Sequence, residues 1–125
     1  MLRAGQFGAA DIQNIAEEIE SIGKGEKREL FSRLSVILPH LLKWQFQPRK
    51  RSASWEASIC AQRNRLARHL QDNPSLQPQL PEAIAETYKD AVLDAIVETR
   101  LAKSAFPLVC PFTHEQVMDE AFRPQ

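Results

Sequence analysis

A basic run carries the side chains best suited to bind a polyanion. Arg49, Lys50 and Arg51 are consecutive, and Arg65 and Arg68 lie further along the next predicted helix, turned away from its apolar stripe. Ammonium and guanidinium groups neutralise phosphates, so these five residues form a candidate nucleic-acid surface. The formal net charge of the chain is zero, however. A solvated, partly ion-paired helix face is therefore the simpler interpretation, and nucleic-acid binding is the alternative.

The histidines and cysteines form no recognisable site. His40, His69 and His114 do not share a helix at metal-ligand spacing, which predicts no metal and no cofactor. Cys60 and His69 are separated by about 13 Å along one helix, too far for a thiolate–imidazole pair. No glycine-rich phosphate loop occurs. An enzyme that uses His40 is only the third hypothesis, and no catalytic residue is predicted.

The composition indicates one soluble domain. The chain has 125 residues, enough for a core without metal or disulfide. Cys60 and Cys110 are interpreted as free thiols in a reducing compartment, because the sequence shows no secretory pattern. No apolar run approaches the roughly 20 residues that a bilayer requires. We therefore expect a cytoplasmic protein that does not contact a membrane.

Apolar side chains at steps of three and four residues predict an all-α bundle, and no strand pattern occurs. Gly23 and Gly25 each cost about 1 kcal/mol in a helix, so a break is expected between two helices there. Pro39 predicts a kink within the second. The prediction is a single domain, 1–125, with four principal helices at about 11–22, 26–46, 53–71 and 81–101, and a short helix at about 114–119 in a docked tail.

Two longer helices are expected to meet at a corner around Pro48, whose ring ends the preceding helix. His40 and Trp44 lie before this corner, and Trp55 and Ile59 lie after it. The two indoles are expected to pack inward, in edge-to-face contact if they meet. His40, Trp44, Pro48, Trp55 and Ile59 are therefore interpreted as structural.

The helix predicted at 81–101 has a second, smaller apolar strip. Leu93, Val97 and Leu101 lie almost opposite the face that carries Ile84 and Tyr88. The tail, with Phe106, Leu108, Val109 and Phe112, is one expected cover, and a second copy of the chain is the other. This strip is the candidate interaction surface.

Five segments together resemble a known bacterial family, the one designated domain of unknown function 29. They are NIAEEIESIGKGEKREL at 14–30, HLLKWQFQP at 40–48, SASWEASI at 52–59, NPSLQPQL at 73–80 and FPLVCPFTHEQVMDEAFRP at 106–124. The resemblance implies a small all-helical fold with no assigned activity, cofactor or catalytic residue.

The chain departs from that family in two ways. Family members usually begin with an additional aromatic-rich helical segment, and Pro39 and Pro81 stand where helix formers are more usual. Without that segment, the apolar faces at 12–22 and 30–42 lack one of the helices expected to pack against them. The expectation is that the chain dimerises through this gap or comes from a truncated reading frame.

Because the sequence shows no catalytic, metal-binding or phosphate-binding motif, the preferred function is a non-catalytic helical protein-interaction module. Its partner would be an unknown protein or a second copy of the chain. The candidate surfaces are the apolar gap and the strip of Leu93, Val97 and Leu101.

Overall fold

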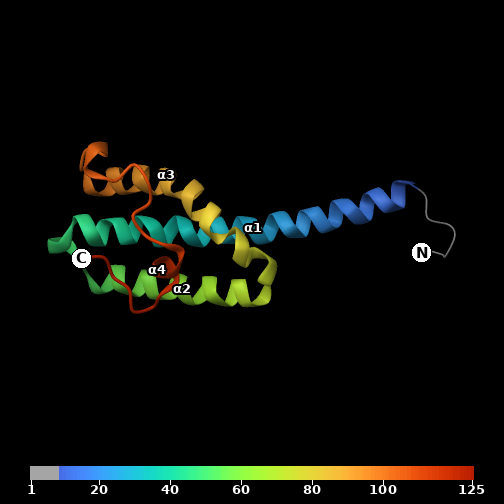
Figure 1. Ribbon diagram of the computed structural model, residues 1–125, viewed down its shortest axis with the longest axis horizontal. Helices are drawn as coiled ribbons and strands as arrows, with labels where there is room; N and C mark the ends of the chain where they lie inside the picture. Colours follow the sequence, from blue (N-terminus) through green and yellow to red (C-terminus); the bar gives the residue numbers. More distant parts are fainter. Residues whose placement is uncertain (1–8) are drawn as a thin grey trace.

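The computed structural model describes the backbone of residues 9–125 and the side chains of residues 23–125. Three long helices, α1 (Ala9–Phe46), α2 (Ala53–Asp72) and α3 (Leu80–Thr99), are followed by the short helix α4 (His114–Met118). Short 3-10 turns lie at Pro48–Lys50, Pro74–Gln79 and Lys103–Ala105, and the described part of the chain contains no strand. The all-α prediction is confirmed (Figure 1).

The prediction of four principal helices is wrong at one place, because the segments predicted at 11–22 and 26–46 are a single helix, α1. Gly23 and Gly25 both lie inside it, and neither has a positive φ. Glycine lowers helix stability but removes no backbone hydrogen bond, so strong helix formers on either side carry the helix through. Pro39 also lies inside α1, which continues to Phe46.

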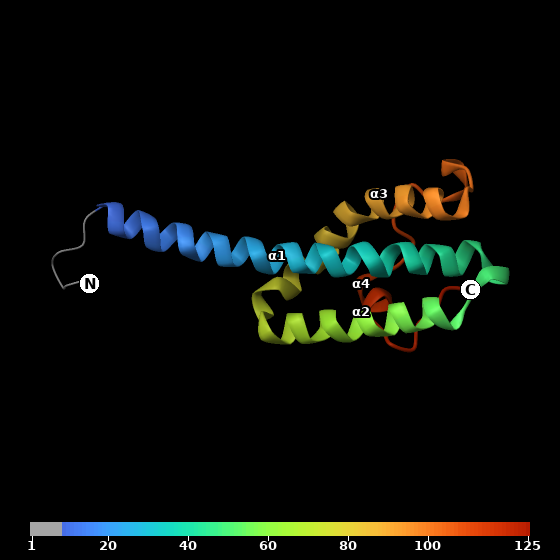
Figure 2. The ribbon, with the colours of Figure 1, turned by 180° about the vertical axis from the view of Figure 1, so that it is seen from behind.

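The core lies around the carboxyl-terminal half of α1. Figures 1 and 2 show α2 and α3 on either side of this half, whereas the amino-terminal half of α1 runs past the ends of both. The core residues of the three helices include Leu34, Ile37, Leu38, Leu41, Ile59, Leu66, Ile84, Tyr88 and Ala95. These positions recur at helical spacing, so burial of one apolar stripe from each helix drives the assembly.

The corner at Pro48 forms as a 3-10 turn, and the Ser52 hydroxyl caps α2 by accepting a hydrogen bond from the Trp55 amide at 3.2 Å. Neither indole is a fully buried core residue, because Trp44 and Trp55 are both half-buried. Each lies beside a cation instead. Arg51 is 5.1 Å from the Trp44 ring centroid, and the Lys43 ammonium is 5.0 Å from that of Trp55.

His40 is half-buried in α1. Its Nδ1 lies 2.7 Å from the Val36 carbonyl oxygen, so the neutral ring donates there. Burial lowers the pKa of His40, which favours this neutral form. Ile59 is fully buried.

The tail after α3 returns across the bundle. Arg100 ends α3 in the left-handed region with φ of 61°, and Phe106, Phe112 and Val117 are buried. A capping box formed by Thr113 and Gln116 begins α4. Within the described residues, no helix has the length and apolar character to cross a membrane.

Candidate interaction surface

The exposed large apolar side chains of the described residues gather on α3 and the tail beside it. The exposed fraction is 53% for Leu93, 77% for Val97, 96% for Leu108 and 78% for Val109. Leu101, the third residue of the predicted strip, is half-buried against the core. The tail adds two exposed apolar residues of its own, Leu108 and Val109.

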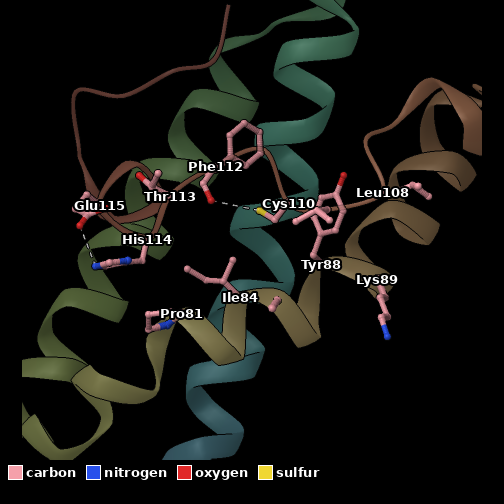
Figure 3. Close-up of a pocket in the computed structure, with 12 residues that line it drawn as sticks. Pro81, Ile84, Tyr88, Lys89, Leu108, Cys110, Phe112, Thr113, His114 and Glu115 are labelled. Carbon is pink, nitrogen blue, oxygen red and sulfur yellow. Dashed lines mark hydrogen bonds and ion pairs between the residues drawn. The ribbon is translucent and has the colours of Figure 1, made fainter.

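A cavity of about 580 Å³ lies between α3 and the tail (Figure 3). Its apolar lining comes from both elements and comprises Pro81, Ile84, Ala85, Tyr88, Leu108, Val109 and Phe112. This volume falls in the range of small-ligand and peptide pockets. Sequence periodicity could not reveal the cavity, because its second wall is an irregular segment.

A second hollow, of about 280 Å³, adjoins the first, since Tyr88, Lys89 and Leu108 line both. It extends the apolar surface along α3 to Leu93 and is closed by Phe106 and Pro107. Together the two hollows form what we call the α3–tail groove. From Pro81 to Leu93 the groove follows α3 for about 18 Å.

The polar groups in the groove are mostly engaged. The Tyr88 hydroxyl donates a 2.6 Å hydrogen bond to the Pro107 carbonyl oxygen, and burial raises the pKa of Tyr88 to about 12. Burial also raises the pKa of the Cys110 thiol, whose sulfur lies 3.6 Å from the Phe112 carbonyl oxygen. His114 Nε2 lies 3.1 Å from a Glu115 carboxylate oxygen. A protonated thiol is a poor nucleophile, so this lining suits binding better than covalent chemistry.

Two lysines supply positive charge to the groove. Lys89 and Lys103 are exposed and take part in none of the ion pairs found among the described residues. Figure 3 shows the Lys89 ammonium at the rim, pointing away from the cavity. The groove is therefore apolar with a cationic edge.

Arg63 fixes the far side of the tail. Its side chain is 1% exposed, and it donates hydrogen bonds to the carbonyl oxygens of Val117, Phe122 and Gln116 at 2.8, 2.8 and 3.0 Å. Burial lowers the pKa of Arg63 to about 10, which leaves it protonated at neutral pH. Arg63 is not among the residues that the sequence pattern singles out. The available signal was its position between Ile59 and Leu66, where the apolar stripe of α2 carries an arginine.

Comparison with known proteins identifies one family. The model of the family described as Domain of unknown function DUF29 matches residues 1–123. The chain belongs to this family. No curated protein and no solved structure matches it.

Further contacts hold the end of this DUF29 tail against the corner and α2. Arg51 donates to the carbonyl oxygens of Trp44 and Pro124 at 2.7 and 3.3 Å. Arg123 pairs with Glu56, and its hydrogen bond lowers the pKa of that carboxyl group.

The basic residues predicted from the sequence lie in two places on the DUF29 fold. Arg49 and Lys50 are exposed at the corner, where Arg51 is held by the carbonyl contacts above. Arg65 and Arg68 are exposed further along α2, in a hollow of about 330 Å³ that Arg33, Glu29 and Asp72 also line. Arg33 is paired with Glu29 at 3.1 Å. Fourteen residues separate Arg51 from Arg65, which corresponds to about 21 Å of helix.

The three histidines also lie apart. His69 contacts the Glu26 carbonyl oxygen at 2.8 Å and a Glu29 carboxylate oxygen at 2.6 Å, between α1 and α2. His40 is at the corner, and His114 lines the α3–tail groove. Across the described residues, no group of three or more metal-ligating side chains comes together.

Proposed function

We propose that this protein is a non-catalytic helical interaction module and that the α3–tail groove binds an apolar segment of a protein. The observation that carries this proposal is that the exposed Leu93, Leu108 and Val109 line the two adjoining hollows of the groove. Contiguous apolar surface beside a hollow is costly in water and typical of binding sites. The engaged hydroxyl, thiol and imidazole groups of the groove favour a binding surface over a reaction centre.

Site-specific photo-crosslinking tests the proposal. A benzophenone amino acid at Val109 would lie beside the groove, and the same residue at Asn64, exposed on α2, is the matched control. Crosslinking in cells should give a discrete covalent product from position 109 and not from position 64. Leu93→Asp should abolish that product without unfolding the protein. Equal products from both positions, or a product that survives Leu93→Asp, would contradict groove binding.

Nucleic-acid binding is a second proposal, favoured by the exposed Arg65 and Arg68 beside Arg33. Fluorescence anisotropy with duplex DNA and single-stranded RNA should show affinity that falls steeply with added salt. Arg65→Glu with Arg68→Glu should abolish it, and Arg49→Glu with Lys50→Glu tests the corner separately. Absence of binding at low salt would remove this function.

A further inference from the structure

The α3–tail groove selects for a particular chemistry. Its floor is apolar, its only lining acid is Glu115, and Glu115 is paired with His114. Lys89 and Lys103 are left at the edge without a carboxylate among the described ion pairs. An apolar segment that carries its own carboxylates would fill the hollows and neutralise both ammonium groups.

The chain itself contains a segment of this kind. Ile12, Ile15, Ile19 and Ile22 are spaced to share one face of a helix, and Glu17, Glu18 and Glu20 fall between them. This segment lies in the amino-terminal half of α1, the half that runs past the ends of α2 and α3 (Figure 1). Because α1 is one continuous helix, the segment cannot fold back into the groove of its own chain.

We propose that the amino-terminal half of α1 from a second copy of this chain docks in the α3–tail groove. This inference rests on the proposed function, since it names the occupant of the same groove. From residue 9 to residue 22 α1 spans about 20 Å and the groove about 18 Å, so the lengths match. The isoleucine face meets the apolar floor, and Glu18 and Glu20, which lie on its two flanks, meet Lys89 and Lys103.

The contact is between different surfaces of the two copies. Reciprocal exchange, with each helix in the groove of the other copy, closes a two-fold dimer, whereas one-sided docking leaves a free helix and a free groove that continue the assembly. Both arrangements predict concentration-dependent association of the full-length protein.

Mapping the crosslink identifies the occupant. A benzophenone amino acid at Leu108 of the full chain should give a covalent dimer whose crosslinked peptide, read by mass spectrometry, comes from residues 9–25. The same amino acid at Asn64 should give no such dimer. A crosslink that maps to another segment of the second copy would overturn the proposal.

Sedimentation velocity with charge reversal supplies the second test. Lys89→Glu with Lys103→Glu should weaken self-association at least about tenfold, and Glu18→Lys with Glu20→Lys should do the same. An equimolar mixture of these two double variants should associate again, because opposite charges meet in both contacts between unlike copies. Unfolding curves for each variant verify that the fold is retained. Failure of the mixture to associate would contradict the charge pairing.

The outcomes separate this inference from the proposed function. If the wild-type protein sediments as a monomer at all concentrations while Val109 still crosslinks to a different protein, self-docking is wrong and the interaction module stands. If the groove positions crosslink to nothing and Leu93→Asp changes nothing, both fail.

Discussion

The tail after α3 has two borders, one against α2 and one against α3, and they differ in their contacts. Hydrogen bonds dominate the α2 border, whereas a hollow lies at the α3 border. Against α2, the buried Arg63 guanidinium is satisfied by three backbone carbonyl groups, and Arg51 and Arg123 add further bonds. Against α3, Tyr88 makes one hydrogen bond, and beside it lies a hollow of about 580 Å³. The α2 border, where buried polar groups are hydrogen-bonded, holds the tail in place. The α3 border has few such bonds and leaves apolar side chains of the tail exposed.

Breaking the α2 border should have the largest effect. Arg63→Ala leaves the carbonyl groups of Gln116, Val117 and Phe122 without donors in a buried site, so the free energy of unfolding should fall by about 3 kcal/mol. Urea unfolding measures this loss, and limited proteolysis should show earlier cleavage in the tail. Arg63→Lys is the matched control: it keeps the charge but cannot reach three carbonyls, so it should recover only part of the loss. If Arg63→Ala is as stable as wild type, the three hydrogen bonds from Arg63 are not needed to hold the tail.

Breaking the α3 border should cost less. Tyr88→Phe removes the hydroxyl bonded to the Pro107 carbonyl oxygen and keeps the buried ring, so the expected loss is about 1 kcal/mol in the free energy of unfolding. Hydrogen exchange at residues 107–110 should accelerate while exchange in α2 stays unchanged. If Tyr88→Phe destabilised the protein as much as Arg63→Ala, the two borders would not differ in the way described.

The helical architecture was readable from the sequence because each part of it depends on local rules. The helical spacing of isoleucine and leucine and the stop at Pro48 both act within a few residues. The sequence pattern did not predict that α1 is continuous. Gly23 and Gly25 lower the stability of a helix, but the helix-forming residues on both sides of them offset this loss. A penalty of about 1 kcal/mol per glycine weakens a helix but does not decide where it ends.

The candidate site was only partly readable, because it is made between elements. Leu93 and Val97 are predictable as an apolar strip on α3, and both are exposed. The hollow that Leu93 lines depends on where the tail returns, and the tail is held in place by Arg63 from a third element. A periodicity argument treats each helix separately, so it cannot place a cavity wall supplied by residues 107–112.

Each cysteine lies at a different border of the tail, so its rate of alkylation measures how accessible that border is. Cys60 is exposed on α2, whereas Cys110 is half-buried in the groove. Because burial raises the pKa of Cys110, its thiolate fraction near neutral pH is below that of an ordinary thiol and grows as the pH rises. Iodoacetamide should therefore modify Cys60 about tenfold faster at pH 7.5, with the rate at Cys110 increasing toward pH 9.5. Peptide mapping of Cys60→Ser and Cys110→Ser proteins measures each rate, and faster alkylation of Cys110 would contradict the burial of this border.

The smallest effect on stability should come from the most exposed residue of the groove. Leu108 is 96% exposed, so Leu108→Asp removes almost no buried surface and should change the free energy of unfolding by less than about 0.5 kcal/mol. Phe106→Ala, two residues away and buried, is the matched control and should cost about 3 kcal/mol. Leu108→Asp should nevertheless eliminate the product crosslinked from Val109, because a carboxylate in the apolar floor opposes any apolar occupant. If a stable Leu108→Asp protein still gives that product, the partner does not bind at the α3 border, even though this border exposes apolar side chains.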